Sequence, residues 1–246
     1  QEGTVAFMQM VKMTQALIAH KAARLPYFVY LRHPTTGGVM ASFGSLGHIT
    51  VAEPNALLGF LGPRVYEALY GEKFPPGVQL AENLQARGIV DAVLPPEALA
   101  EAVDRGLRVL MAPRTNLPDV EPPEPVPSPQ GPAWESILVT RRPERPGIRQ
   151  LLRHAATDVV ALNGTGQGET DPGMLLMLAR IGAIPCIVLG QCRHGQSVES
   201  PMGPGALREA RRGFRLAREL DLPLVTVIDT PGAALSAAAE NGGIAG

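Results

Sequence analysis

Gly37 and Gly38 are successive glycines that lie between an apolar stretch and a segment of helical composition. Because glycine has no side chain, two neighbouring backbone N–H groups can approach a ligand closely at such a pair. At the start of a helix these amides also gain from the helix dipole and form a pocket for negative charge. Paired donors of this kind stabilise an oxyanion or an enolate. A tight turn without a ligand is the structural alternative for the same two residues.

Asp229-Thr230-Pro231-Gly232 is a second candidate, because it follows an apolar stretch as the second nucleotide motif of GTPases does. That activity also needs a G-x-x-x-x-G-K-[ST] loop, which the sequence does not contain. Residues 134–246 contain no lysine that could bind a phosphate. The glycines at 164–168 lack the spacing of a dinucleotide loop, and a surface loop is the simpler interpretation. Nucleotide hydrolysis is therefore disfavoured.

Other reactive patterns are weak. Cys186, Cys192 and His194 have the spacing C-x5-C-x-H without a fourth ligand, which does not match structural zinc sites. Cys186 falls within an apolar stretch and is expected to be buried, as free cysteines commonly are. There is no G-x-S-x-G motif, so a serine hydrolase of the α/β class is disfavoured. No metal site is predicted.

The composition limits the class of protein. The 246 residues are 45% hydrophobic and carry a net charge of −1, without a polybasic segment. Nucleic-acid binding and docking to membrane surfaces are therefore not expected. No apolar run reaches the roughly 18 residues of a membrane-spanning helix. Two cysteines and the absence of a recognisable signal peptide favour a reducing, cytoplasmic location.

Prolines divide the chain, since 10 of the 24 lie between positions 113 and 146. We predict a first lobe (residues 1–112), a Pro-rich linker (113–133) and a second lobe (134–246). Apolar runs alternate with helical patterns in both lobes, which indicates an α/β fold. Helices are expected at 4–23, 39–47, 63–70, 96–111, 173–181 and 205–220. Strands are expected at 27–31, 56–60, 89–94, 158–162, 185–190 and 223–229.

Both lobes resemble the carboxyltransferase subunits of bacterial acetyl-CoA carboxylase, in the order β subunit and then α subunit. The resemblance to the β subunit is carried by Met8-Gln-Met-Val-Lys12, Leu25-Pro-Tyr27, Pro34-Thr-Thr-Gly-Gly-Val-Met-Ala-Ser-Phe43, Ala52-Glu-Pro-Asn-Ala56, Gly59-Phe-Leu-Gly-Pro-Arg-Val65 and Arg87-Gly-Ile-Val-Asp-Ala92. The resemblance to the α subunit is carried by Ala133-Trp-Glu-Ser-Ile137, Arg142-Pro-Glu-Arg-Pro146, Gly205-Ala-Leu-Arg-Glu-Ala210 and Pro223-Leu-Val-Thr-Val-Ile-Asp-Thr-Pro-Gly-Ala233.

The resemblance implies two crotonase-like (ClpP/crotonase) lobes, each incomplete in this chain. It implies transfer of CO2 from carboxybiotin, held on a biotin carboxyl carrier protein, to the α-carbon of acetyl-CoA or another acyl-CoA, giving malonyl-CoA for fatty-acid synthesis in the first case. Gly37 and Gly38 would then supply backbone donors to the thioester oxygen. The residues that would line the biotin pocket are Asp229, Thr230, Pro231, Gly232 and Ala233. Arg208, Arg211 and Arg212 could pair with CoA phosphates, with a solvated helix face as the alternative.

The sequence also departs from the family pattern. The zinc ribbon of the β subunit is absent, so no zinc is expected, and the chain ends at Gly246 before a second Gly-Gly pair for biotin is reached. We therefore expect a longer polypeptide or a completing partner, and a homodimer or larger assembly that works with biotin carboxylase. Two alternatives stay open: a non-catalytic scaffold, and another crotonase-type acyl-CoA enzyme with Glu53 or Glu67 as the base.

Overall fold

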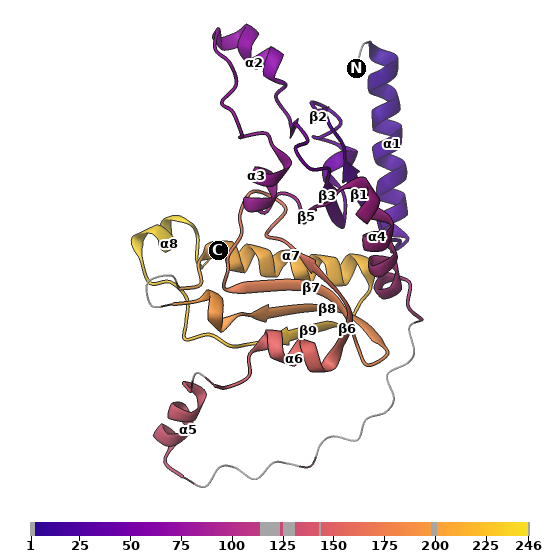
Figure 1. Ribbon diagram of the computed structural model, residues 1–246. Helices are drawn as coiled ribbons and strands as arrows, with labels where there is room; N and C mark the ends of the chain where they lie inside the picture. The colour runs from indigo at the N-terminus through magenta and orange to yellow at the C-terminus, as the bar shows by residue number, and fades with distance from the viewer. Residues whose placement is uncertain (1–2, 114–123, 125–130, 143, 198–200, 246) are drawn as a thin grey trace.

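The computed structural model describes residues 3–113, 124, 131–142, 144–197 and 201–245. Figure 1 shows the first lobe on the same side of the second lobe's sheet as helix α7 (Pro204–Leu220). The predicted linker, 113–133, lies almost wholly outside the described residues, so its predicted conformation is untested.

Small parallel sheets and short helices form the first lobe. One sheet has the order β1-β3-β5, and β2 pairs with β4 in a second sheet. The strands are β1 (Phe28–Leu31), β2 (Thr35–Thr36), β3 (Ile49–Ala52), β4 (Leu58–Gly59) and β5 (Ala92–Val93). The helices are α1 (Thr4–Ala22), the 3-10 helix η1 (Phe43–Ser45), α2 (Pro63–Tyr70), α3 (Ala81–Ala86) and α4 (Pro96–Leu110). Pro63 and Pro96 open α2 and α4, where a missing N–H costs nothing.

The second lobe is built on a four-stranded sheet with the order β6-β7-β8-β9. Its strands are β6 (Ala156–Leu162), β7 (Met174–Ile181), β8 (Ile184–Gln191) and β9 (Leu224–Val227). Its helices are α5 (Ala133–Thr140), α6 (Ile148–Ala155), the 3-10 helix η2 (Arg193–Gly195), α7 (Pro204–Leu220) and α8 (Ala237–Asn241). The strands from β6 to β8 are antiparallel neighbours, and β9 joins β8 in parallel.

One hydrophobic core crosses from lobe to lobe. Buried side chains of β3 and α4, including Ile49 and Val109, pack with Leu178 of β7, Ile187 of β8 and Leu216 of α7. On the other face of the sheet, α6 packs against β7 and β8 in a separate cluster. The largest cluster of buried apolar side chains therefore contains residues of both lobes. The boundaries of the lobes in the sequence stay a prediction.

The helix predicted at 173–181 is wrong, because Met174–Ile181 is the central strand β7. Met, Leu and Ala favour helices locally, but this segment pairs with β6 on one side and β8 on the other. Gly182, with φ of +61°, begins the two-residue connection to β8, across which Ile181 pairs with Ile184. Tertiary pairing thus overrides the helical propensity.

Three further expectations need correction. Residues 39–47 are turns and η1 instead of a helix, and the Gly44 N–H donates to the carbonyl oxygen of Val39, five residues earlier, at 3.0 Å. The strands expected at 56–60 and 89–94 shrink to two residues each. The elements that were not predicted are β2, β3, α3, α5, α6, η2 and α8. The other predicted helices and strands are confirmed within a few residues at their ends.

Candidate active site

Gly37 and Gly38 lie directly after β2, in the turn that leads to η1. Gly37 has a φ of +65°, and no atom lies within 4 Å of the place where a Cβ would stand. Its N–H donates to the carbonyl oxygens of Gly59 and Phe60, at 3.1 and 3.0 Å. The Gly38 N–H has no acceptor among the described residues. The Gly37 amide is therefore engaged in this structure, and only the Gly38 amide is free to bind an oxyanion.

The turn is held by its own hydrogen bonds. The Ser42 hydroxyl donates to the carbonyl oxygen of Gly38 at 2.6 Å, and the Ala41 N–H donates to that of Gly37 at 3.1 Å. Both carbonyls of the pair are thus fixed, which orients the peptide that carries the Gly38 N–H. A fixed donor needs no reorganisation when charge develops on a bound oxygen.

The Glu53 side chain is engaged in hydrogen bonds with the segment that precedes β2. Its carboxylate accepts the His33 N–H at 3.0 Å and the Arg32 guanidinium at 3.3 Å. These two hydrogen bonds lower the pKa of Glu53, so its carboxylate is a weaker base than an ordinary glutamate. Glu67 lies exposed on α2. The arrangement gives Glu53 a structural task and offers no support for it as the base of a crotonase-type reaction.

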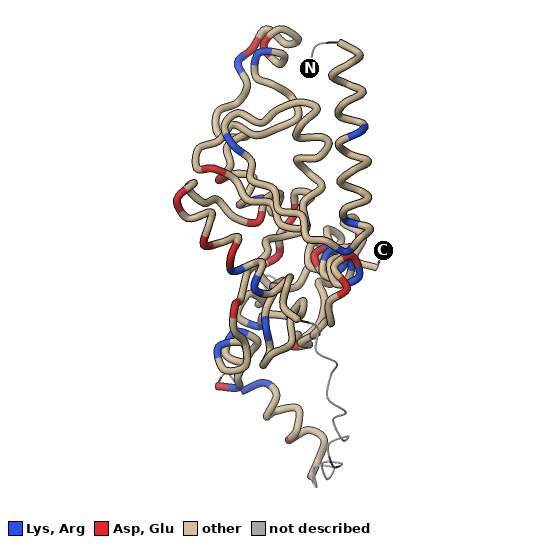
Figure 2. Tube along the Cα trace, turned by 90° about the vertical axis from the view of Figure 1, so that its right-hand side faces the viewer, with Lys and Arg blue, Asp and Glu red and all other residues tan. Residues whose placement is uncertain are grey.

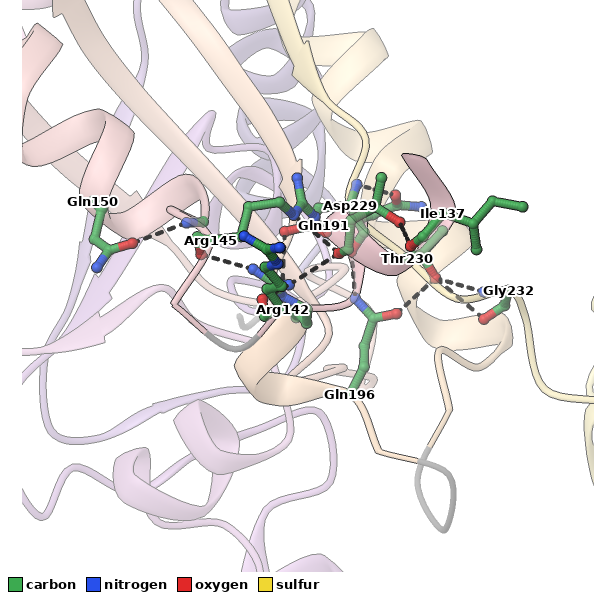
Figure 3. A network of polar contacts seen from close by, with 12 residues as sticks. Ile137, Arg142, Arg145, Gln150, Gln191, Gln196, Asp229, Thr230 and Gly232 are labelled. Atoms are coloured by element: carbon green, nitrogen blue, oxygen red, sulfur yellow. Dashed lines mark hydrogen bonds and ion pairs between the residues drawn. The ribbon is translucent and has the colours of Figure 1, made fainter. Parts of the chain in front are cut away.

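The Asp229 turn is defined here as residues 229–233, which follow β9. The Asp229 side chain is only 8% exposed, and its carboxylate forms ion pairs with Arg145 and, at 3.8 Å, with Arg193. The Asp229 N–H donates to Gln191 at 2.9 Å, and its carbonyl oxygen accepts from Gln196 at 3.2 Å. Figure 3 shows the side chains of Arg145, Gln191 and Gln196 gathered around Asp229. Each polar group of this residue is therefore bound.

The rest of the Asp229 turn leaves backbone accessible. The Thr230 hydroxyl donates to Gln196 at 2.7 Å and accepts the Gly232 N–H at 3.1 Å. Gly232 has a φ of +138° with open space where a Cβ would stand, and Ala233 pairs with Met202 in an isolated bridge. Pro231 lies between these fixed points.

Arg212, one of the three arginines that could pair with CoA phosphates, has its guanidinium engaged within the protein. Its guanidinium is buried between the lobes, where it binds Asp91 at 2.9 Å and the carbonyl oxygens of Asn163 and Gly164 at 3.0 Å. A weaker contact reaches the carbonyl oxygen of His48 at 3.4 Å. Arg212 and Asp91, named here the interlobe ion pair, therefore join α7 to the first lobe.

Arg208 is also engaged within the protein. Its guanidinium binds both carboxylate oxygens of Glu169, at 2.5 and 2.7 Å, and the carbonyl oxygen of Gly242 at 2.8 Å. This arrangement connects α7 to α8 and leaves Arg208 poorly placed for phosphates. Arg211 is exposed on α7, and its contact with CoA stays a prediction.

Sequence reasoning did not single out the four side chains that bind Asp229, which are Arg145, Arg193, Gln191 and Gln196. Arg145 belongs to the motif Arg142-Pro-Glu-Arg-Pro146, which supported the family resemblance but was assigned no role in the site. The partners come from segments 33 to 84 residues away in the chain, so no local spacing reveals them.

Glu209 of α7 is a buried acidic residue that the sequence analysis did not single out. It is 2% exposed, and its Oε2 has no hydrogen-bond partner among the described residues. Burial raises the pKa of Glu209 to about 8, and the carboxylates of Asp171 and Asp91 act in the same direction against Arg212. The carboxyl group is therefore mainly protonated at neutral pH.

Glu209→Gln is expected to stabilise the protein at alkaline pH. Because the folded-state pKa lies above the ordinary value of 4.5, the folded state of the protein loses stability as pH rises from about 4.5 to about 8. The variant should raise the free energy of unfolding by about 4 kcal/mol at pH 8 and leave it nearly unchanged at pH 4.5. Thermal melts at both pH values measure this, with exposed Glu101→Gln as control. Equal shifts at both pH values would contradict the buried-acid interpretation.

The described residues contain no group of three or more His, Cys, Asp or Glu side chains arranged to hold a metal ion. Cys186 and Cys192 are free and buried, and Cys186 packs in the core between α6 and the sheet. None of the described helices is both long and apolar enough to cross a membrane.

The glycine turn with its free amide lies in the first lobe of this α/β fold, and the Asp229 turn lies in the second lobe. The chain belongs to the carboxyl transferase family, since the family model described as "Carboxyl transferase domain" matches residues 1–246. This confirms the family resemblance.

Among curated relatives, the probable biotin-dependent acyl-coenzyme A carboxylase beta3 subunit of Mycobacterium tuberculosis is 61% identical over 100% of this chain and 49% of its own length. The acetyl-coenzyme A carboxylase carboxyl transferase subunits beta/alpha of Salinispora tropica are 34% identical over 99% of this chain and 46% of their length. The chain thus spans about half the length of the curated relatives it matches.

Solved structures share the fold. Transcarboxylase 12S, described as a hexamer with methylmalonyl-coenzyme A and methylmalonic acid bound, matches with a TM-score of 0.72 at 19% identity. The match covers 100% of this chain and 47% of that one. A single-chain, multi-domain long-chain acyl-CoA carboxylase matches with a TM-score of 0.68 over 93% of this chain and 22% of its own, also at 19% identity. The predicted crotonase-like α/β fold is confirmed.

Proposed function

We propose that the protein is the carboxyltransferase component of a biotin-dependent acyl-CoA carboxylase. It would transfer a carboxyl group from carboxybiotin to the α-carbon of an acyl-CoA. The substrate proposed first is acetyl-CoA, which would give malonyl-CoA as product. The observation that carries the proposal is the match of all 246 residues to the carboxyl transferase family. The names of the relatives, which include biotin-dependent and acetyl-CoA carboxylases, support the substrate class.

Carboxyl transfer to an acyl-CoA requires that the enzyme stabilise negative charge on the thioester oxygen. Removal of an α-proton converts the thioester into an enolate, and charge develops on the carbonyl oxygen. The free Gly38 N–H can donate to that oxygen, and the bonds from Ser42 and Ala41 hold the donor in place. Gly37, with its positive φ, shapes the turn. Carboxybiotin supplies the carboxyl group and, once that group has left, a base for the α-proton.

The Asp229 turn is proposed as part of the pocket for the biotin ureido group. The open backbone at Gly232 and the fixed hydroxyl of Thr230 support this assignment. Pro231 and Ala233 would form the apolar part of the same surface. The carrier protein, biotin carboxylase and a homodimer or larger oligomer are the proposed partners, in the cytoplasm.

Apolar surface on α1 supports the proposed oligomer. None of its residues is buried, and exposed apolar side chains include Val5, Phe7 and Met8. Figure 2 shows α1 standing along one side of the first lobe with few charged residues. An exposed apolar surface of this kind commonly marks a protein interface.

The test of the proposed function is carboxyl transfer in the full-length protein, measured in reverse from malonyl-CoA to biocytin. Methylmalonyl-CoA, assayed in parallel, distinguishes acetyl-CoA from a longer acyl-CoA as the natural substrate. Transfer with either compound supports the proposal. Absence of transfer with both, from a folded protein that still binds the carrier protein, would instead favour the non-catalytic scaffold.

A further inference from the structure

The Asp229 carboxylate faces two guanidinium groups, and these groups differ in what else they hold. Arg145 pairs with Oδ1 and donates from its Nε to the carbonyl oxygen of Thr140 at 3.1 Å. Arg193 lies 3.8 Å from Oδ2 and donates to the carbonyl oxygens of Thr140, Arg142 and Arg145, at 3.4, 3.2 and 2.8 Å. Arg193 therefore fixes the backbone that presents Arg145.

This arrangement joins three parts of the second lobe at one residue. Arg145 comes from the segment between α5 and α6, Arg193 from η2, and Asp229 from the loop after β9. Figure 3 shows the Arg145 and Asp229 side chains directed toward each other, with Gln196 on the other side of the turn. Gln196 contacts both the Asp229 carbonyl oxygen and the Thr230 hydroxyl.

Charge and burial make Asp229 dependent on the arginines. The carboxylate is 8% exposed, whereas the side chains of Arg145 and Arg193 are 35% and 23% exposed. Removing Arg145 would leave the buried Asp229 carboxylate with only the more distant Arg193 as a cation. Because an unpaired buried charge is costly, the Asp229 side chain would then move toward water. Because Thr230 follows Asp229 directly, such a movement would displace the hydroxyl and the open backbone at Gly232.

We propose that Arg145, itself presented by Arg193, is a positioning residue that sets the orientation of the Asp229 turn and thereby the affinity of the site for the biotinyl group. Its effect on affinity rests on the proposed carboxyltransferase function, whereas its effect on the turn does not. Arg145 touches no substrate in this role, because its guanidinium is used by Asp229 and Thr140.

The experiment compares Arg145→Gln and Arg145→Lys with Arg142→Gln in the full-length protein. Arg142 is the matched control, since its side chain is exposed and only its carbonyl oxygen contributes to the network. Arg145→Gln should raise the KM for biocytin at least fivefold and leave the KM for malonyl-CoA unchanged. Arg145→Lys should restore part of the biocytin affinity, because it keeps the charge but loses the fork of donors. Arg142→Gln should behave as the unmodified protein.

Hydrogen exchange provides a readout that does not depend on activity. In Arg145→Gln the amides of residues 229–233 should exchange faster, while those of β7 stay protected. Faster exchange in Arg145→Gln, combined with no carboxyl transfer by the unmodified protein, would uphold the positioning role and overturn the proposed function. Unchanged exchange at 229–233, or equal rises in both KM values together with a general loss of thermal stability, would overturn the positioning role.

Discussion

Gly38→Pro in the full-length protein is expected to lower carboxyl transfer from malonyl-CoA to biocytin by about 100-fold, with little change in the KM for malonyl-CoA. Proline removes the one N–H of the glycine pair that has no acceptor among the described residues. That N–H is proposed to bind the thioester oxygen most strongly when it carries the enolate charge. Its loss should therefore raise the barrier more than it weakens binding of the ground state.

Gly38→Ala is the matched control for this prediction, because alanine keeps the N–H. Most of the activity should survive in Gly38→Ala, and both variants should melt near the temperature of the unmodified protein. Similar losses in the two variants would show that the space at position 38, and not its amide, matters for the reaction. Full turnover in Gly38→Pro would remove Gly38 from the mechanism.

Arg212→Met is expected to destabilise the protein by about 3–5 kcal/mol. The substitution roughly keeps the volume of the side chain but leaves Asp91 buried without its cation, and it frees the carbonyl oxygens of Asn163 and Gly164. Asp91 would still accept the N–H groups of Thr50 and Asn163, at 2.9 Å each. Urea denaturation measures the change in the free energy of unfolding.

An exposed ion pair offers the contrast. Arg108 and Asp104 are four residues apart on α4, and their side chains are 62% and 57% exposed. Arg108→Met should change the free energy of unfolding far less than Arg212→Met, since exposed pairs of this kind contribute little. If Arg212→Met cost no more than Arg108→Met, the interlobe ion pair would have no special role in stability. A double-mutant cycle with Asp91→Ala would isolate the coupling between the two residues.

Local signals in the sequence predicted the elements whose structure depends on local chemistry. Prolines at the first turn indicated α2 and α4, and α7 ends at Leu220 as predicted and begins one residue earlier than predicted. Continuous apolar runs indicated β6, β8 and β9. By contrast, β7 depends on its neighbours, because the same Met, Leu and Ala residues would form a helix if they were not paired on both sides.

The candidate site was predictable to a similar degree. Glycine pairs and the Asp229 turn can be found from sequence, since their residue types limit the backbone directly. The engagement of the Gly37 amide could not be predicted, because its acceptors, Gly59 and Phe60, come from a strand that only the fold brings near. Arg212 likewise resembled an exposed helix arginine until Asp91 of the other lobe was seen beside it.

The shared core and the interlobe ion pair mean that the covalent link between the lobes is not what keeps them together. A protease cut between residues 114 and 130 is therefore expected to leave both pieces in one complex that unfolds in a single transition. In evolutionary terms, such an interface allows one polypeptide to be divided into two separately encoded chains, or two chains to be fused, without loss of the assembled unit. Asp91 and Arg212 would then meet across a subunit boundary instead of within one chain.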